Sequence, residues 1–258
     1  MQNPFTISII TVTKNSARTI ERAVRSVYFQ KDVKVEHIIK DAGSNDQTIE
    51  IARLTNPLLT VVSIKDTGIY DAMNQGYSKS TGDIIAFLNS DDHYIDDHVL
   101  SDVINAFNVS DCDFVYGDII MASLSGEIVR VWQTGKIGAE GLAWQQIPHP
   151  SIFIKRNVLS QLLLPFDPSY KISADFKQQL LIINKFKLKG AYLNRPLVMM
   201  ETGGESTNSF SSYFTGWKES VRAYNEVFGS GGIWYVVKKV FSKLKGVNLK
   251  AQLQNFGK

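Results

Sequence analysis

The sequence predicts an α/β fold in which a mainly parallel, Rossmann-like sheet is flanked by helices. Short β-rich segments alternate with helical patterns over about the first 110 residues, as in βαβ units. Polar clusters follow the expected strands, where ligands bind in such sheets. The chain has 258 residues, of which 44% are hydrophobic and 21% charged, so it suits one large globular domain or a domain with a small appendage.

Four strands are expected to alternate with four helices in the first part of the chain. The strands are expected at residues 7–12, 35–40, 59–65 and 83–89. The first helix carries apolar side chains at helical spacing, with Ser16 as its predicted N-cap: Ile20, Val24 and Val27. The other helices are expected at residues 46–54, 70–80 and 97–107, and Asp46 is the predicted cap of the first of these.

After about residue 110 the alternation becomes irregular. Strands are expected at residues 114–121 and 127–133, around a turn at Ser125-Gly126, and at residues 151–155 and 191–200. Helices are expected at residues 175–186 and 211–228. We expect one domain over residues 1–228, divided at residue 120 into a regular and an elaborated half, followed by a basic tail over residues 229–258.

Charge and cysteine content exclude several classes of protein. The net charge is +3, but the last thirty residues hold six lysines and no acidic residue, so the body of the chain is mildly acidic. A body of this charge argues against nucleic acid as a partner. The single cysteine, Cys112, allows no intramolecular disulfide, and no Cys/His cluster offers a zinc site.

Targeting and membrane signals are weak. The apolar runs are far shorter than the about 18–20 residues of a spanning helix. No basic segment precedes the first apolar run, as a signal peptide would need. We therefore expect a cytoplasmic protein.

The polar clusters that follow the four strands point to a ligand site. They lie at residues 11–15, 41–46, 66–76 and 89–92. The carboxyl ends of parallel strands meet at one edge of a sheet, so these clusters are expected to lie together. The glycine-rich fingerprints of dinucleotide-binding and P-loop proteins are missing, as is the G-x-S-x-G motif of serine hydrolases.

Two of these clusters allow either a ligand-binding or a structural interpretation. The adjacent carboxylates of Asp91 and Asp92 repel each other unless a cation or hydrogen-bond donors lie beside them. A Mg²⁺ or Mn²⁺ ion would relieve that repulsion, but Asp92 or Asp97 could instead cap the next helix. Asp41 could likewise do no more than form an Asx-turn with the glycine and serine that follow it.

Taken together, the four clusters resemble the motifs of family 2 glycosyltransferases. The resemblance lies in SIITVTKN at residues 8–15, DAGSNDQT at 41–48, DTGIYDAMNQG at 66–76 and GDIIAFLNSDD at 82–92. It is dense over residues 5–120 and thinner to about residue 205. It implies the GT-A fold, an inverting transfer, a nucleotide-sugar half over residues 1–120 and an acceptor half over residues 121–228.

The resemblance also implies roles for particular residues. The nucleotide-sugar residues would be Thr11, Thr13, Asn15, Asp41, Asp71, Asn74 and Asp91. Among these, Asp41 would accept the N3–H of uracil and Asp91 would face the ribose, while Asp92 would coordinate the metal. Asn89 stands where the family often has Asp, and Ile64 where relatives often have Glu.

The second half would supply the chemistry. The resemblance implies that Asp175, at the start of a helix, removes the proton from the attacking hydroxyl; the alternative is a helix N-cap. His149 could approach the metal or the leaving phosphate, or be a buried structural histidine. Trp144 could stack on a sugar or belong to the core.

The segment at residues 233–245 combines aromatic, aliphatic and lysine residues. On a helix, one side would hold Ile233, Val236, Val237, Val240, Phe241 and Leu244. This pattern is typical of a helix that lies on an anionic membrane surface. The alternative is a helix packed against the domain or a second subunit.

Together with these observations, the resemblance implies a metal-dependent inverting glycosyltransferase that uses a UDP-sugar. The resemblance implies a glycan or lipid-linked oligosaccharide as acceptor, in the synthesis of a bacterial surface polysaccharide such as an O-antigen, with the enzyme at the inner face of the membrane. Two alternatives remain open. One is a sugar-1-phosphate nucleotidyltransferase, although its basic glycine-rich loop is missing after the first strand. The other is an inactive relative that binds nucleotide or glycan.

Overall fold

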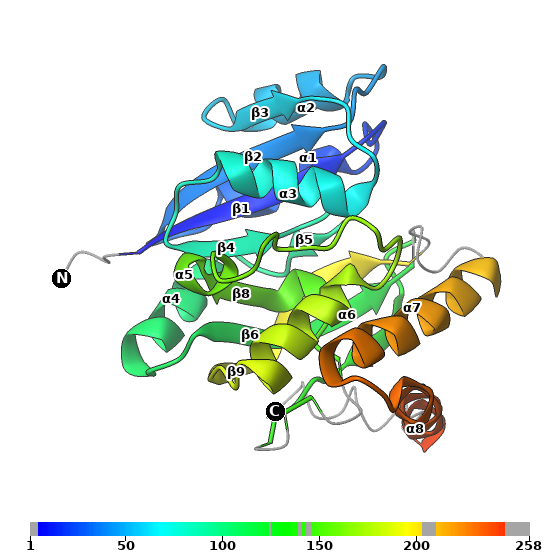
Figure 1. Cartoon of the computed structure of the whole chain (residues 1–258). Helices are drawn as coiled ribbons and strands as arrows, with labels where there is room; N and C mark the ends of the chain where they lie inside the picture. Colours follow the sequence, from blue (N-terminus) through cyan, green and yellow to red (C-terminus); the bar gives the residue numbers. More distant parts are fainter. Residues whose placement is uncertain (1–4, 124, 139–140, 143–145, 203–209, 246–258) are drawn as a thin grey trace.

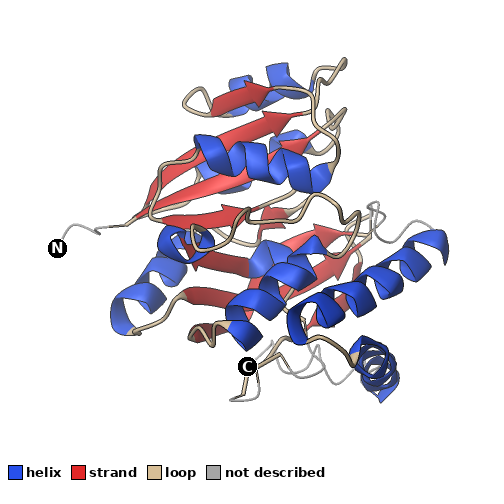
Figure 2. Ribbon diagram, viewed as in Figure 1, coloured by secondary structure: helices blue, strands red, loops and turns tan. Residues whose placement is uncertain are grey.

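The computed structural model describes residues 5–123, 125–138, 141–142, 146–202 and 210–245, without side-chain detail for residues 210, 211 and 240–245. Its described strands form one sheet in the order β3-β2-β1-β4-β8-β6-β9-β5, with β7 paired to β6 (Figures 1 and 2). Helices α3 and α6 cover one face of the sheet, and α1 and α4 belong to the other side. The predicted α/β class is confirmed.

The first part of the chain has the predicted alternation. It runs β1 (Thr6–Thr13), α1 (Ile20–Tyr28), β2 (Lys34–Asp41), α2 (Thr48–Thr55), β3 (Thr60–Ser63), α3 (Ile69–Lys79) and β4 (Ile84–Phe87). The pairs β1–β2, β2–β3 and β1–β4 are all parallel. Seven of the eight residues of β1 are buried, as expected of a strand covered on both faces.

One glycine lets α3 lie directly against β1. A Cβ atom at Gly76 would come within 2.4 Å of Cγ2 of Ile10. The close approach brings Tyr70 and Met73 of α3 into one apolar cluster with Ile10. Helix α3 is thereby fixed over the sheet, and its first turn faces the second part of the chain.

The second part mixes antiparallel and parallel pairs. It comprises β5 (His93–Tyr94), α4 (Val99–Val109), β6 (Phe114–Ala122), β7 (Ile128–Trp132), a 3₁₀ turn (His149–Ser151), β8 (Ile152–Lys155), α5 (Arg156–Leu159), α6 (Ala174–Gln179), a π-helical segment (Leu180–Lys185) and β9 (Gly190–Glu201). Strand β8 pairs antiparallel with β4 and β6, whereas β9 runs parallel to β6. The predicted strands and helices of this part are present, and the shortest elements, β5 and α5, were not predicted.

The last two described helices are α7 (Phe210–Phe228) and α8 (Gly232–Lys245), and they lie against each other (Figure 1). The ring of Tyr235 in α8 lies 5.1 Å from that of Phe176 in α6 and 5.0 Å from that of Tyr224 in α7. Tyr235 and Val236 are buried. One side of α8 therefore packs on the domain, as the predicted alternative has it. Val236 is buried there, whereas Ile233 and Val237, which are neighbours of each other on the helix surface, are exposed. Among the described helices, none is long and apolar enough to cross a membrane.

Candidate functional site

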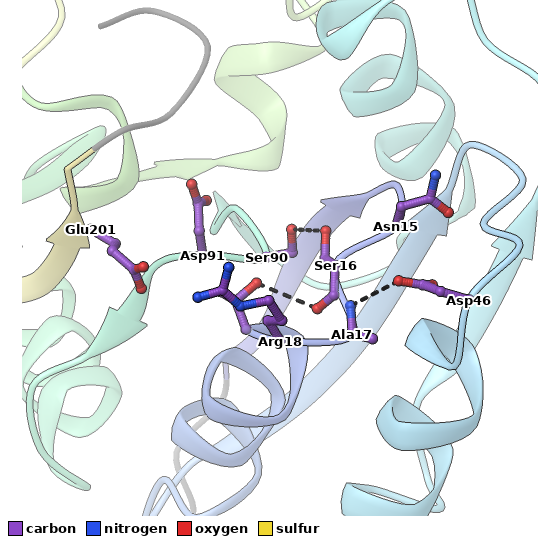
Figure 3. A pocket seen from close by; sticks show the side chains of 9 residues that line it. Asn15, Ser16, Ala17, Arg18, Asp46, Ser90, Asp91 and Glu201 are labelled. Carbon is purple, nitrogen blue, oxygen red and sulfur yellow. Dashed lines mark hydrogen bonds between the residues drawn. The ribbon is translucent and has the colours of Figure 1, made fainter. Parts of the chain in front are cut away.

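A cavity of about 430 Å³ opens at the carboxyl edge of the sheet. Its lining comes from the loops after β1, β2 and β4 and from the last residue of β9, and consists of Asn15, Ser16, Ala17, Arg18, Thr19, Asp46, Ser90, Asp91 and Glu201. Figure 3 shows Asp91 and Glu201 on one side of the cavity and Asn15 and Asp46 on the other. Three of the four predicted polar clusters, those that follow β1, β2 and β4, therefore meet, whereas no residue of the fourth, at residues 66–76, lines the cavity. Of the predicted nucleotide-sugar residues, Asn15 and Asp91 line this cavity.

The loops after β1 and β2 hold each other through hydrogen bonds. Asn15 has a positive φ of 51°, its N–H donates to Ser44 Oγ at 2.8 Å, and its Oδ1 accepts the N–H of Asn45 at 3.0 Å. The N–H of Ala17 donates to Asp46 Oδ2 at 3.2 Å. This wall of the cavity is therefore set by the two loops before any ligand is present.

Neither predicted helix cap has the expected geometry. Helix α1 begins at Ile20, and its first residue donates to the carbonyl of Ser16, whose hydroxyl lies 2.9 Å from that of Ser90 (Figure 3). The Ser16 cap is therefore wrong, because the chain makes an extra turn before α1. Asp46 lies two residues before Thr48, the first residue of α2, and accepts the N–H of Thr48 at 3.1 Å, while Gln47 stands at the N-cap position. Asp46 thus closes a turn at the start of α2 and also joins it to Ala17.

The two adjacent carboxylates have different environments. Asp91 lines the cavity, and burial followed by the charge of Glu201 raises its pKa. Asp92 is only 1% exposed, and burial together with Asp91 raises its pKa well above the usual range. Asn89 Nδ2 donates to Asp92 Oδ2 at 3.3 Å, whereas Oδ1 is buried and finds no hydrogen-bond partner among the described residues. The metal role of Asp92 stays a prediction, and Asp91 is the carboxylate that reaches the cavity.

Three charged side chains beside this pair, two arginines and one glutamate, were not predicted as site residues. Arg22 donates to the carbonyl of Asp91 at 3.2 Å and forms an ion pair with Glu201. Arg18 also lines the cavity. Arg18 lies just before α1 and Arg22 in its first turn. Their spacing of four residues was the only signal in the sequence that could have marked them as site residues. Within the described parts of the chain, no three His, Cys, Asp or Glu side chains converge to hold a metal by themselves.

Asp41 is held by its own loop. It is 2% exposed, and its carboxylate accepts the N–H of Gly43 at 3.0 Å, the hydroxyl of Ser44 at 2.6 Å and the hydroxyl of Ser63 at 2.9 Å. This is the Asx-turn interpretation. The uracil contact stays a prediction.

The two threonines of β1 that were predicted as site residues, Thr11 and Thr13, point into the protein. Thr11 is buried, and its hydroxyl lies 3.1 Å from Nε2 of His37. Burial lowers the pKa of His37 to about 3, so this imidazole is neutral at physiological pH. Thr13 is 6% exposed, and its hydroxyl has no partner within the described residues. Neither is part of the cavity lining.

Asp71 and Asn74 of α3 both have hydrogen-bond partners within the protein, Asp71 a local one and Asn74 a distant one. Asp71 accepts the N–H and the hydroxyl of Thr67 at 2.8 and 3.0 Å, and these bonds hold its pKa below the usual range. Asn74 is 7% exposed; its amide donates to the carbonyl of Phe166 at 2.7 Å and accepts the N–H of Phe166 at 3.0 Å. The structure therefore favours a structural role for Asn74, which joins α3 to the loop before α6.

Asp175 lies in the first turn of α6, where side chains hold both of its oxygens. The hydroxyl of Tyr70 donates to Oδ1 at 3.2 Å, and Nε2 of Gln146 donates to Oδ2 at 3.0 Å. The start of α6 is instead held by Glu219 of α7, whose carboxylate accepts the N–H groups of Lys171, Ile172 and Ser173 at 2.8–2.9 Å. Asp175 lies inside the first turn of α6, and Ser173 stands at the N-cap position, so the N-cap alternative for Asp175 is wrong.

His149 is enclosed by aromatic rings. Its imidazole lies 5.7 Å from the ring of Phe87 and 5.2 Å from that of Phe166. Burial lowers its pKa, against the charge of Asp175. Its Nε2 is buried without a hydrogen-bond partner in the part of the chain that is described. This packing favours the structural alternative, its metal role stays a prediction, and Trp144 lies outside the described residues.

Comparisons with known proteins agree with this geometry. A family model described as Glycosyl transferase family 2 matches residues 8–159, more than half of the chain. A PGL/p-HBAD biosynthesis glycosyltransferase of Mycobacterium bovis (strain BCG / Pasteur 1173P2) is 30% identical over 174 residues, which cover 66% of this chain and 66% of that protein. The chain thus spans just under two thirds of that relative's length.

Two solved structures have a similar fold. The structure of S. aureus TarS 1–349 has a TM-score of 0.68 at 16% identity, and the match covers 96% of this chain and 77% of the TarS chain. TarS 1–349 has also been solved with UDP-GlcNAc. The second structure is glucosyl-3-phosphoglycerate synthase from Mycobacterium tuberculosis, solved with Mn²⁺, UDP and phosphoglyceric acid. It has a TM-score of 0.60 at 17% identity, and the match covers 89% of this chain and 81% of the synthase chain. These likenesses confirm the predicted GT-A fold.

Proposed function

The chain belongs to glycosyltransferase family 2, and we propose that it moves a sugar from a UDP-sugar to a hydroxyl of a glycan acceptor. The observation that carries the proposal is the cavity in which Asn15, Arg18 and Asp91 meet at the carboxyl edge of the sheet. Its volume of about 430 Å³ is in the range of small-molecule sites. UDP is the preferred nucleotide because both solved neighbours have been crystallised with UDP or a UDP-sugar.

The donor diphosphate is assigned to the cavity. The guanidinium of Arg18 can form charge-assisted hydrogen bonds with phosphate oxygens. The carboxylate of Asp91 cannot, because it would repel them. A divalent cation resolves this conflict, and the donors present fit one: Asp91 supplies a carboxylate and buried Asp92 has an oxygen without a partner among the described residues.

Asp91 would hold this ion, with Asp92 behind it, and diphosphate and water oxygens would complete its coordination. When bound, Mn²⁺ or Mg²⁺ would neutralise charge on the departing diphosphate. Asn15 and Asp46 form the opposite wall and would limit how the nucleotide enters.

The acceptor chemistry is assigned to Asp175. In an inverting displacement the acceptor oxygen bonds to C1 of the sugar while the bond from C1 to the diphosphate oxygen breaks. A carboxylate has about four lone-pair positions, and Tyr70 and Gln146 occupy two of them. Asp175 therefore retains the capacity to accept the proton of the acceptor hydroxyl, and the nucleoside diphosphate leaves with the bonding electrons.

We propose residues 1–120 as the donor half, residues 121–228 as the acceptor half and residues 229–258 as a tail that contacts an anionic membrane at its cytoplasmic face. In α8, Ile233 and Trp234 are 66% and 70% exposed. The chain after Glu226 carries lysines and no acidic residue, which favours anionic lipid. Such a contact would suit a lipid-linked oligosaccharide acceptor in surface-polysaccharide synthesis.

The membrane contact is tested by sedimentation with vesicles. Wild type is expected to sediment with phosphatidylglycerol-containing vesicles more than with phosphatidylcholine vesicles, and W234S is expected to lose much of the difference. Equal sedimentation of wild type with both kinds of vesicle would refute the contact.

Product analysis tests the transferase proposal. UDP-glucose, UDP-galactose and UDP-GlcNAc are incubated with the protein, with and without Mn²⁺, and UDP and pyrophosphate are measured. We expect metal-dependent release of UDP, either by hydrolysis when no acceptor is present or by transfer of the sugar to an added glycan. A parallel incubation supplies UTP and glucose 1-phosphate, and pyrophosphate release there would indicate a nucleotidyltransferase. Nucleotide binding without any product in either incubation would indicate an inactive relative.

A further inference from the structure

Helix α8 is connected to the carboxylate of Asp175 by a chain of hydrogen bonds. The ammonium of Lys239, on the inward side of α8, donates to Oε1 of Gln146 at 2.7 Å. Nε2 of the same amide donates to Oδ2 of Asp175 at 3.0 Å. The three residues come from segments that are far apart in the sequence, so only the folded chain brings them together.

The chemistry of the three groups fixes the orientation of the amide. An ammonium has only donors and an ionised carboxylate has only acceptors. The amide of Gln146 lies between them, so it must turn its oxygen to Lys239 and its NH₂ to Asp175. The reverse orientation would bring oxygen to carboxylate and NH₂ to ammonium, and both contacts would be unfavourable. Lys239 therefore reinforces the amide orientation that Asp175 requires and fixes the oxygen end of Gln146.

On the opposite side of the carboxylate, the single O–H proton of Tyr70 is shared between Asp175 and a backbone carbonyl. The hydroxyl of Tyr70 lies 2.6 Å from the carbonyl of Ile172 and 3.2 Å from Oδ1 of Asp175. Tyr70 is 7% exposed and stacks on Phe166 with 5.5 Å between ring centroids. The side toward Gln146 has no comparable backbone support in the described structure, so the position of Oδ2 depends on Gln146 and Lys239.

We propose that Gln146 and Lys239 are positioning residues for Asp175, and that packing of α8 on the domain orients the carboxylate that receives the acceptor proton. The ammonium of Lys239 also lies 4.8 Å from the ring centroid of Phe176, the residue after Asp175, which keeps the lysine at this point of α6. This inference rests on the proposed role of Asp175 as the base. It makes the tail helix part of the machinery that sets the turnover rate.

The test compares K239M with K238M, a matched variant on the exposed side of α8. UDP release is measured with the UDP-sugar that is cleaved fastest among UDP-glucose, UDP-galactose and UDP-GlcNAc, without lipid. K239M is expected to lower kcat about 5- to 30-fold, the loss typical of one misplaced hydrogen bond in a reacting constellation, with the donor KM changed less than about twofold. K238M is expected to retain the wild-type kcat, and K239R to recover most of it.

A double variant shows whether Lys239 acts through Gln146. If it does, Q146L/K239M is no slower than Q146L alone, because the chain is already broken. A loss equal to the product of the two single losses would overturn the proposal and assign Lys239 to packing on Phe176. A kcat of K239M equal to that of K238M would overturn it as well. The Tm of each variant is measured, and if K239M is not folded at the assay temperature, Q146L decides alone: wild-type kcat refutes the proposal.

Failure of the proposed function gives a different result. If D175N retains wild-type turnover, Asp175 is not the base and the proposed mechanism fails. If D175N abolishes turnover while K239M and Q146L remain at the wild-type rate, only the positioning role is refuted.

Discussion

Asp41 and Asp175 show how differently the two halves of the molecule hold a carboxylate. Three of the groups that donate to Asp41 belong to Gly43 and Ser44, within three residues of it, and the hydroxyl of Ser63 is a fourth. The donors to Asp175 are Tyr70, 105 residues away, and Gln146, 29 residues away. The first carboxylate organises its own loop, whereas the second is organised by the rest of the fold.

This difference separates two functions. On the donor side, loops that follow parallel strands are shaped by hydrogen bonds to each other and leave Asp91 and Arg18 facing the cavity. On the acceptor side, Asp175 depends on α3, on the segment before the 3₁₀ turn and, through Gln146, on α8. Substitutions on the acceptor side should therefore change turnover, and substitutions on the donor side should change nucleotide binding or stability.

The largest expected effect is the loss of the base. D175N keeps the shape of the side chain and can no longer take a proton, so kcat is expected to fall about 10²- to 10⁴-fold. D167N is a matched control, because Asp167 is a carboxylate bound by a lysine outside the cavity. Turnover measured as UDP release checks the prediction. A kcat of D175N within about threefold of wild type would remove Asp175 from the mechanism.

The next effect concerns a buried ion pair on the donor side. Lys40 is fully buried and donates to Asp66 Oδ2 at 2.8 Å and to the carbonyl of Ile64 at 2.6 Å. It also donates to the carbonyl of Asp41 at 3.0 Å. K40M leaves all three acceptors without that donor, so the free energy of unfolding is expected to fall by about 3–5 kcal/mol. Urea unfolding measures it, and K40M/D66N is expected to regain part of the loss. If K40M had the same free energy of unfolding as wild type, the ion pair between Lys40 and Asp66 would not contribute to folding.

A smaller effect is expected where the two halves meet. N74A removes both hydrogen bonds between α3 and the backbone of Phe166, and a loss of about 2–3 kcal/mol in the free energy of unfolding is expected. Affinity for UDP, measured where the variant is folded, is expected to stay within about twofold of wild type. A large loss of UDP affinity with little loss of stability would instead restore the predicted nucleotide contact of Asn74.

The smallest effect is on stability in acid. Burial opposes ionisation of Asp167, but hydrogen bonds from Lys177 and Ser169 outweigh it and lower the pKa to about 2. A carboxylate with a lowered folded-state pKa stabilises the protein above its ordinary value of 3.8, and this contribution is lost as the pH falls toward 2. D167N is expected to lose under about 1 kcal/mol at pH 7 and to show a flatter loss of stability between pH 4 and 2. If the stability of D167N depended on pH between 4 and 2 as that of wild type does, the lowered pKa of Asp167 would be contradicted.

The same contrast explains what the sequence could predict. The strands and helices of the donor side follow from hydrophobic periodicity, and the clusters after β1, β2 and β4 meet because parallel strands end at one edge. The Ser16 cap failed because propensity cannot foresee the turn at residues 16–19 before α1. β5 and α5, of two and four residues, are too short to carry a periodic signal.

The residues missed at the site are those that tertiary structure brings in. Glu201 reaches the cavity from the end of β9, and Gln146 reaches Asp175 from a segment with no recognisable pattern. Nothing in the sequence around Glu201 or Gln146 identifies it as a site residue, because the residues that each contacts lie more than twenty positions away in the chain. Asp175 itself was predicted from the family resemblance, and its surroundings required the fold.

The most direct test of the division between the two halves is a calorimetric titration of UDP in the presence of Mn²⁺, performed on wild type, D91N and D175N. We predict that D175N binds UDP within about twofold of wild type, while D91N binds at least about tenfold more weakly because the carboxylate at the cavity is lost. Equal losses of affinity in both variants, or unchanged affinity in D91N, would contradict the assignment of donor binding to Asp91 and proton transfer to Asp175.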